Sequence, residues 1–435
     1  MYLMKKISLF ISLSVLGCLF QSQAFAALNL TLAQGISGAV PVAVVPFNGD
    51  GDNGIAAIVS SDLRNSGRFN ALPASQMPEQ PHSAAQVNFA AWKAIKQNDL
   101  VVGDVSSAGG GQYRIHFQLL DVYKGAPPLL DQTMVVPQSR FRAAAHHISD
   151  MIYQTLTGVR GIFSTRIAYV LVNHNSRRAS KWSLEVADYD GYNPRAILIS
   201  NQPIMSPAWS HDGQKIAYVS FENQRSQIYI SNIATGARTL VTSYPGVNGA
   251  PAWPPNDSQL ALALSRTGVT KIYVLNLSDR QLQQITSGNS IDTEPGYSPD
   301  GKSLLFTSDR GGSPQIYRVT LGNNQVQRIS YKGSYNARAS FSPNGSQIVM
   351  IHVGENTNGY GIGLQDLQAG AYLTLDNSGD DQSPSFAPNG QMVLFSSKTG
   401  AQRQLALVST DGQIKLRLPS DQGSVQDPAW SPFLN

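Results

Sequence analysis

The chain has 435 residues, of which 42% are hydrophobic and 14% charged, and its formal net charge is +4. This length exceeds what one hydrophobic core usually serves, so we expect two domains. The few charges argue against a disordered chain or a solvated helical bundle, and the weak positive charge gives no support for nucleic-acid binding. The 38 glycines and 24 prolines favour a turn-rich β-protein.

The N-terminus has the pattern of a secretory signal peptide. Lys5 and Lys6 precede an apolar stretch over residues 7–20 that is too short to span a bilayer, and small residues favour cleavage after Ala26. Cleavage there removes both lysines, which lowers the net charge to +2, and removes Cys18, the only cysteine. The mature chain would then have no disulfide, thiolate metal site or Cys nucleophile. An alternative is a lipoprotein that is lipidated at Cys18.

Directly after the expected cleavage point, leucines alternate with polar or small residues. Leu28, Leu30 and Leu32 form this alternation, and a segment bounded by Gly35 and Gly38 follows. Such a pattern is typical of a β-strand. It leaves two interpretations open: an edge strand of the first domain, or a mobile strand that pairs with a partner's sheet. The residues alone favour the edge strand, because chain termini are often tied into sheets.

Residues 27–162 alternate between expected strands and helices. The strands are expected over 42–47, 100–103 and 113–122, and the helices over 54–66, 89–97 and 139–157. Gly67 and Gly158 follow two of these helices, where glycine commonly ends a helix. The pattern predicts a small α/β domain that is joined through residues 158–164 to the remainder of the chain.

Residues 163–435 carry an internal repeat of 44 or 45 residues. Its aromatic anchors are Trp209, Trp253, Tyr297, Phe341, Phe386 and Trp430. A tight turn and three β-rich runs follow an anchor, and four strands in this length match one propeller blade. Trp430 has almost no chain after it, whereas residues 166–170 resemble a second strand that lacks an anchor. We therefore predict a mainly β fold: a six-bladed β-propeller whose closing blade combines both ends of the array.

No catalytic constellation is recognisable. Residues 296–303 fit the phosphate-loop pattern by letter, but a strand follows them where a helix is required. His146 and His147 lack the spacing of a zinc protease. We therefore expect no catalytic residues and no enzyme. Two alternatives stay open: an exported propeller hydrolase or lyase, and a carbohydrate- or cation-binding module using loop tyrosines such as Tyr331 and Tyr335.

Six loops that join a fourth strand to the next first strand converge on one mouth of the channel. They span residues 201–206, 243–250, 287–294, 331–338, 376–383 and 420–427. Their acidic residues are Asp292, Glu294, Asp376, Asp380, Asp381, Asp421 and Asp427, against the cations Lys332 and Arg338. This count predicts an acidic mouth that receives a basic partner segment or holds calcium near Asp292 and Asp381.

Several segments, in this order along the chain, identify a family. They include Asp62-Leu63-Arg64-Asn65-Ser66-Gly67, Asp188-Tyr189-Asp190-Gly191-Tyr192-Asn193, Met205-Ser206-Pro207-Ala208-Trp209 and Pro428-Ala429-Trp430-Ser431-Pro432. Together they resemble the TolB family of the Tol–Pal system over essentially the whole mature chain. The resemblance implies a non-catalytic, monomeric periplasmic adaptor that needs no cofactor, does not insert into the membrane and supports outer-membrane integrity and constriction at division.

The resemblance also implies partners and sites. The peptidoglycan-associated lipoprotein Pal would bind the loop face at Met205, Val247, Asn248, Ala250, Thr293, Glu294, Arg338, Asp381 and Asp427. TolA would bind an N-terminal segment, residues 27–38, that includes Ala27, Leu28, Leu30, Leu32 and Gly35. This implication favours the mobile-strand interpretation. Other periplasmic or outer-membrane proteins and colicins are further candidate partners.

Overall fold

Seven sheets organise the computed structural model, which describes residues 30–35, 37–49, 54–176, 179–355, 357–420 and 422–434. The expected signal peptide with Cys18 lies outside these residues, as do Ala27, Leu28 and Asp421. No helix among the described residues is long and apolar enough to cross a membrane.

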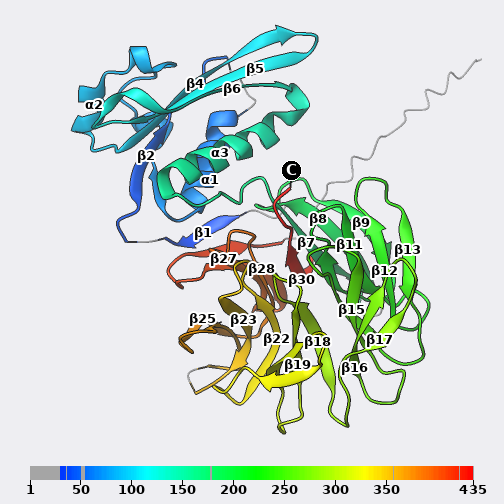
Figure 1. Ribbon diagram of the computed structural model, residues 1–435. Coiled ribbons are helices and arrows are strands. Elements are labelled where there is room, and N and C mark those ends of the chain that lie inside the picture. Colours follow the sequence, from blue (N-terminus) through cyan, green and yellow to red (C-terminus); the bar gives the residue numbers. More distant parts are fainter. Residues whose placement is uncertain are drawn as a thin grey trace, which may run out of the picture.

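One five-stranded sheet with helices on its faces forms the first domain (Figure 1). Its strand order is β3 (Phe69–Ala71), β2 (Val40–Val44), β4 (Asp99–Gly109), β5 (Gln112–Asp121) and β6 (Gly125–Pro137). The helices are α1 (Ile55–Asn65), α2 (Phe89–Ala94) and α3 (Phe141–Thr157), with 3₁₀ turns η2 (Ala74–Gln76), η3 (Ala84–Gln86) and η4 (Gln138–Arg140). Strand β2 runs parallel to β3 and β4, whereas β4, β5 and β6 form an antiparallel meander. The expected α/β character of this region is confirmed.

The two long helices form where the sequence predicts them. Helix α3 ends at Gly158, which adopts a left-handed φ of 76° that glycine tolerates without strain. Leu63 of α1 and Ile148 of α3 are fully buried against the sheet. Strand β6, which contains Pro127, Pro128 and Pro137, was not among the expected strands. Proline is tolerated in it because β6 has a neighbour on one side only.

Six further sheets form the propeller. Blade 1 consists of β10 (Ile204–Trp209), β11 (Lys215–Ser220), β12 (Gln227–Asn232) and β13 (Arg238–Thr242), and blade 2 of β14 (Asn248–Ala252), β15 (Gln259–Leu264), β16 (Lys271–Asn276) and β17 (Leu282–Gln284). Blade 3 consists of β18 (Asp292–Tyr297), β19 (Ser303–Ser308), β20 (Gln315–Thr320) and β21 (Gln325–Arg328), and blade 4 of β22 (Tyr335–Phe341), β23 (Gln347–Val353), β24 (Tyr360–Asp366) and β25 (Tyr372–Gly379). Blade 5 contains β26 (Asp381–Phe386), β27 (Met392–Thr399), β28 (Gln402–Ser409) and β29 (Lys415–Leu418).

Blade 6 joins the two ends of the array, as predicted. Strand β30 (Ser424–Trp430) pairs with β7 (Arg166–Ser176), which continues into β8 (Ala179–Asp188) and β9 (Arg195–Ser200). The indole Nε1 of Trp430 donates a hydrogen bond to Thr165 Oγ1 at 2.8 Å. The six-bladed propeller with a composite closing blade is therefore confirmed.

Strand β1 (Thr31–Gln34) belongs to the propeller and not to the first domain. It pairs antiparallel with β29, with Thr31 opposite Arg417 and Leu32 opposite Leu416, and so becomes a fifth strand of blade 5. The expectation of a first-domain edge strand is wrong. The alternation predicts a strand, but it contains no information about which sheet edge the strand joins.

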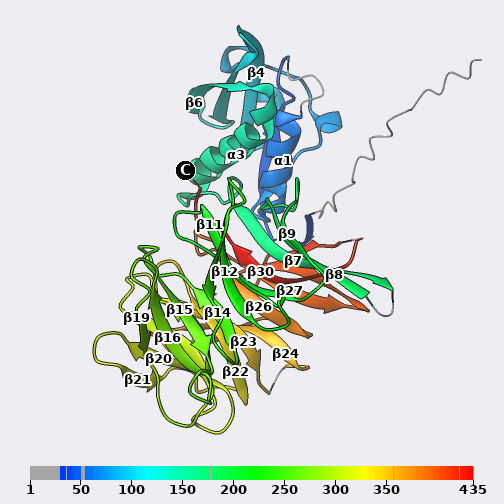
Figure 2. The same cartoon turned by 90° about the vertical axis from the view of Figure 1, so that its right-hand side faces the viewer.

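The first domain lies on one face of the propeller, with α1 and α3 nearest to it (Figures 1 and 2). Arg68 Nη2 donates to Gln391 Oε1 of blade 5 at 3.4 Å, and Asn389 Nδ2 donates to the carbonyl of Arg160 at 3.0 Å. Gln391 and Asn389 belong to the turn between the first and second strands of blade 5. The first domain therefore covers the face opposite the loops that join successive blades.

Candidate protein-binding sites

The first strand in every blade contains a bulge at the same position. The residue at the bulge has a left-handed backbone although it is not glycine. These residues, the channel ring, are Ser206 (φ 51°), Ala250 (46°), Glu294 (55°), Arg338 (55°), Ser383 (58°) and Asp427 (48°). Such a conformation is costly for a residue with a side chain, so its recurrence points to a position of functional interest.

The channel ring lines the central channel of the propeller. Five of its members line a cavity of about 590 Å³ to which all six blades contribute. Arg338 of blade 4 reaches across to blade 6, where its Nη1 lies 2.9 Å from Asp427 Oδ1, and its Nη2 lies 3.4 Å from Ser206 Oγ of blade 1. Asp427 also accepts hydrogen bonds from Ser383 Oγ at 2.8 Å and from the Ser206 backbone N–H at 3.1 Å. The ion pair between Arg338 and Asp427 therefore spans the ring.

The ion pair shifts the ionisation of both partners. Burial by itself raises the pKa of Asp427, but the opposite charge of Arg338 and hydrogen bonds to Ser206 and Ser383 outweigh it, so that the pKa is lowered. Burial by itself lowers the pKa of Arg338, but Asp427 and Glu294 raise it overall. Both groups are therefore charged over the physiological range.

Glu294 is held from the neighbouring strand. Thr307 Oγ1 donates to Glu294 Oε2 at 2.8 Å and accepts from the backbone N–H of Arg338 at 2.9 Å. Glu294, Thr293 and Ala250 remain half-buried. These three residues, named from the sequence, lie at or beside the ring.

Two other residues named from the sequence lie beneath the surface. Asn248 is fully buried, accepts from the Tyr244 backbone N–H at 3.0 Å and donates to the Tyr244 carbonyl at 2.7 Å. Asp381 is also fully buried and accepts a hydrogen bond from Ser378 Oγ, and burial raises its pKa to about 6. Both side chains fix their own loops, and a partner could not touch them directly.

Exposed apolar side chains mark the loop face. They are Met205 (42% exposed), Val247 (46%), Ile291 (52%) and Tyr331 (70%). Sequence reasoning named Met205 and Val247 for this face and considered Tyr331 only for a sugar site, while Ile291 was missed. A signal existed, because Val247 and Ile291 occupy equivalent positions 44 residues apart, directly before a buried first-strand residue. We call these four residues the apolar rim.

The carboxylates of the loop face are largely neutralised by cations. Asp292 lies 3.0 Å from Lys271 Nζ and 2.9 Å from Arg310 Nη2. Further pairs are Asp376 with Lys415 (3.2 Å), Asp380 with Arg403, and Asp427 with Arg338 (2.9 Å). These ion pairs correct the prediction that the mouth of the channel is acidic. Most of these cations lie on strands and turns outside the loops, so a count over the loops omitted them.

The same pairings disfavour calcium near Asp292 and Asp381. Asp292 in blade 3 is already paired with two cationic side chains, those of Lys271 and Arg310, and Asp381 lies in a different blade, blade 5. Within the described part of the chain, three metal-capable side chains lie within 4.8 Å of one another at Asp62, His146 and Asp190, at the domain junction. Asp292 and Asp381 therefore do not form a shared carboxylate site for a hard cation.

The N-terminal strand is attached through few contacts. Leu30 and Leu32 are partly buried against the core, whereas Thr31, Ala33 and Gln34 are exposed. Gly35 passes close to the first domain, because a Cβ there would lie 3.3 Å from the carbonyl oxygen of Gly67. The TolA-segment residues that the structure describes therefore lie along blade 5, next to α1.

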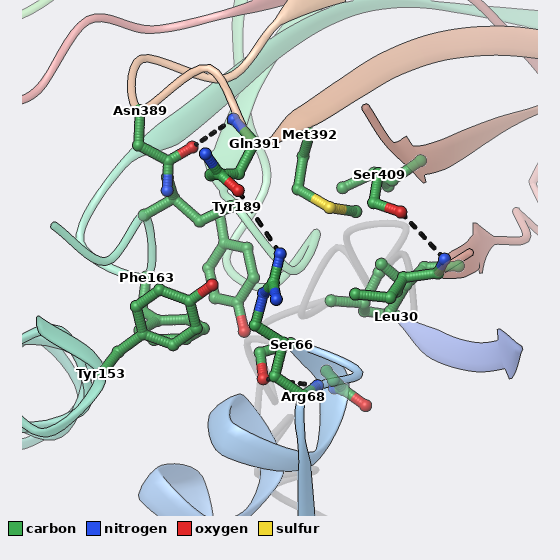
Figure 3. Close-up of a pocket in the computed structure, with 15 residues that line it drawn as sticks. Leu30, Ser66, Arg68, Tyr153, Phe163, Tyr189, Asn389, Gln391, Met392 and Ser409 are labelled. Carbon is green, nitrogen blue, oxygen red and sulfur yellow. Dashed lines mark hydrogen bonds between the residues drawn. The ribbon is translucent and has the colours of Figure 1, made fainter. Parts of the chain in front are cut away.

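A small pocket of about 30 Å³ lies beneath this strand (Figure 3). Leu30, Arg68, Tyr153 and Met392 line it, so that the N-terminal segment, the first domain and blade 5 meet there. Its walls are mainly apolar, and its volume has room for little more than a water molecule. With Leu30 in place, little space therefore remains between the N-terminal segment, the first domain and blade 5.

A buried polar cluster also joins the two domains. Asp62 of α1 accepts hydrogen bonds from Ser149 Oγ of α3 at 2.7 Å and from Tyr189 OH of the propeller at 2.8 Å, and it lies 2.8 Å from His146 Nδ1. Burial by itself lowers the pKa of His146, but the Asp62 carboxylate raises it overall. The Asp62–Tyr189 contact was not predicted, because the two residues belong to separate motifs that lie 127 residues apart and no local pattern links them.

These features define a class of protein: a six-bladed propeller joined to a small α/β domain, with an apolar rim on one face and a docked strand beside the other. Family models agree with both parts. The model described as the TolB beta propeller domain matches residues 153–434, and that of the TolB amino-terminal domain matches residues 28–127.

Similar proteins cover nearly the whole chain. The Tol-Pal system protein TolB of Coxiella burnetii is 58% identical over 96% of each chain, and that of Nitrosococcus oceani is 55% identical over 94% of each. The crystal structure of TolB from Acinetobacter baumannii superposes with a TM-score of 0.87 at 43% identity, over 93% of this chain and 100% of that one. The chain belongs to the TolB family and is a non-catalytic component of the Tol–Pal system.

Proposed function

We propose that the chain is a periplasmic adaptor that binds Pal through the loop face of its propeller and TolA through its N-terminal segment. In this role it supports outer-membrane integrity and constriction at division, and it acts as a monomer. Other envelope proteins and colicins are further candidate ligands. The observation that carries the proposal is the apolar rim around the channel ring.

The apolar rim supports a protein ligand. Met205, Val247, Ile291 and Tyr331 leave apolar area in water, and covering such area with a partner is favourable. Inside the rim, Glu294 and Arg338 supply fixed charges that can select a ligand. A ligand that covers the rim and reaches the ring would gain both affinity and specificity.

The N-terminal strand supports a second ligand. It pairs with β29 over three residue positions and is otherwise held by two partly buried leucines, so its release breaks a limited set of interactions. A released strand can add to the edge of a partner's sheet by backbone hydrogen bonds. The leucines that pack on blade 5 would then contact TolA, so docking and TolA binding exclude each other.

Titration calorimetry with purified Pal and TolA tests both sites. Met205→Glu combined with Val247→Glu should weaken Pal binding at least tenfold and leave TolA binding unchanged. Deletion of residues 27–38 should abolish TolA binding and retain Pal binding. Ile199→Glu is the matched control, since Ile199 is 56% exposed on β9 and lies outside the apolar rim.

Two results would contradict the proposal. Unchanged Pal affinity in the double variant, at an unchanged melting temperature, would remove the apolar rim from the site. Retention of TolA by the truncated chain would move that site elsewhere in the molecule.

A further inference from the structure

Strand β6 is a free edge of the first-domain sheet, far from both sites proposed above. It has thirteen residues and pairs with β5 on one side only. Exposed sheet edges invite pairing with other chains, and proteins usually protect them with proline, lysine or bulges. Pro128 and Pro137 protect the two ends of β6, but residues 129–136 contain no proline, lysine or arginine, and Leu129 and Val135 are exposed.

A groove runs between this edge and helix α3. Its volume is about 660 Å³, and its walls include Met134 and Val136 of β6 and Met151 of α3. The apolar side chains on this side of β6 alternate along the strand and continue the first-domain core. A strand added to β6 would therefore place every second side chain in this groove.

The groove carries a positive charge at one end. Arg140 and His147 line it and are exposed, and Arg140 is a permanent cation. Within the described part of the chain, Arg140 is not in an ion pair. The acidic residue of β6, Asp131, accepts hydrogen bonds from Gln118 Nε2 at 2.6 Å and lies 2.8 Å from His116 Nε2. The positive charge of Arg140 in the groove is therefore not neutralised by Asp131.

We propose that the β6 edge is a third protein-binding site, which takes up an extended segment of a partner protein with alternating apolar residues and at least one carboxylate. The carboxylate would lie next to Arg140 and His147, and the apolar residues would contact Met134, Val136 and Met151. Backbone hydrogen bonds to β6 provide the pairing, and the charges select the ligand.

Two other occupants fit less well. The chain's own N-terminal segment has no Asp or Glu before Asp50, so it lacks the required carboxylate. A second copy would pair through the same surface on both sides and bring Arg140 and His147 near their own counterparts. Charge complementarity therefore favours a different, acidic chain.

Peptide binding to the mature protein tests the site. The probe is a blocked synthetic peptide of alternating valine and threonine with a glutamate at each end, compared with the same peptide carrying lysines. The glutamate peptide should bind at least tenfold more tightly, measured by fluorescence anisotropy at low salt. Arg140→Glu with His147→Glu should remove this preference. Arg225→Glu with Lys302→Glu, which changes the charge at exposed positions in the propeller, should leave it intact.

Hydrogen exchange supplies a readout that does not depend on the charge variants. Amides within residues 129–136 should gain protection when the glutamate peptide binds. Equal binding of the two peptides, or binding without protection of β6, would overturn the proposal. Concentration-dependent dimerisation that protects β6 without peptide would also overturn it and assign the edge to a second copy. Pal and TolA binding are measured separately, so failure here leaves the adaptor function untouched.

Discussion

Arg338 connects blade 4 with Asp427 of blade 6 and Ser206 of blade 1. Removing one partner of a largely buried ion pair leaves the other charge uncompensated, which costs more than removing both. We expect Arg338→Met to lower the free energy of unfolding by about 2 kcal/mol, and Arg338→Met with Asp427→Asn to recover most of it. Denaturant titration measures both variants. A double variant no more stable than the single one would contradict this role of the pair.

His146 makes the domain junction sensitive to pH. Its folded pKa is raised above its unfolded value, so its contribution to stability is complete below the unfolded pKa and is lost as pH rises through the folded pKa. The melting temperature should fall as the pH rises above 6.5, the ordinary pKa of histidine, and His146→Gln should flatten this slope. Asp99 and Asp381, whose pKa values are about 6, change their contributions mainly below this window. Calorimetry in buffers of matched ionic strength measures these melting temperatures. If the slope were the same in the variant, His146 would not be the source of the pH dependence.

At the scale of elements, β30 holds the ring of blades together. Trp430 is buried. Its indole N–H donates a hydrogen bond to Thr165 Oγ1, and its backbone N–H donates one to Ser385 Oγ at 3.0 Å, so it links blades 5 and 6. Trp430→Ala should lower the free energy of unfolding by about 3–5 kcal/mol, and deletion of residues 426–435 should open or unfold the ring. Tyr331→Ala is the matched control, because Tyr331 is 70% exposed. A truncated chain that melts like the intact one would refute the closure.

Repeated elements could be predicted from the sequence, and unique contacts could not. The anchors from Trp209 to Trp430 recur because each fills the same place between blades, so a period of 44 or 45 residues suffices to count the blades. Three features depend on pairs that neither the repeat nor a local pattern links: the docking of β1 on β29, the Asp62–Tyr189 contact, and the pairing of Asp292 with Lys271. Their partners can be identified only once the blades are assembled, which is why the acidic mouth was expected.

At the scale of the whole molecule, the proposed sites lie on different surfaces. The apolar rim lies on the loop face, whereas the first domain and β1 contact the opposite turns of blade 5 and its strand β29. The β6 edge lies on the first domain, away from both (Figure 1). An adaptor with separate surfaces can hold more than one partner at once, and any coupling between partners must pass through blade 5 or the domain junction.

The pairing of β1 with β29 also determines an order of events during folding. Thr31 and Arg417 are 386 residues apart, so β1 is synthesised long before the edge that receives it exists. Contacts between such distant segments form late, because closing a long loop is entropically unfavourable until other contacts support it. The first domain, whose strand pairs lie within residues 40–137, can fold earlier. A nascent chain would therefore present a free N-terminal strand next to a folded first domain until blade 5 is complete.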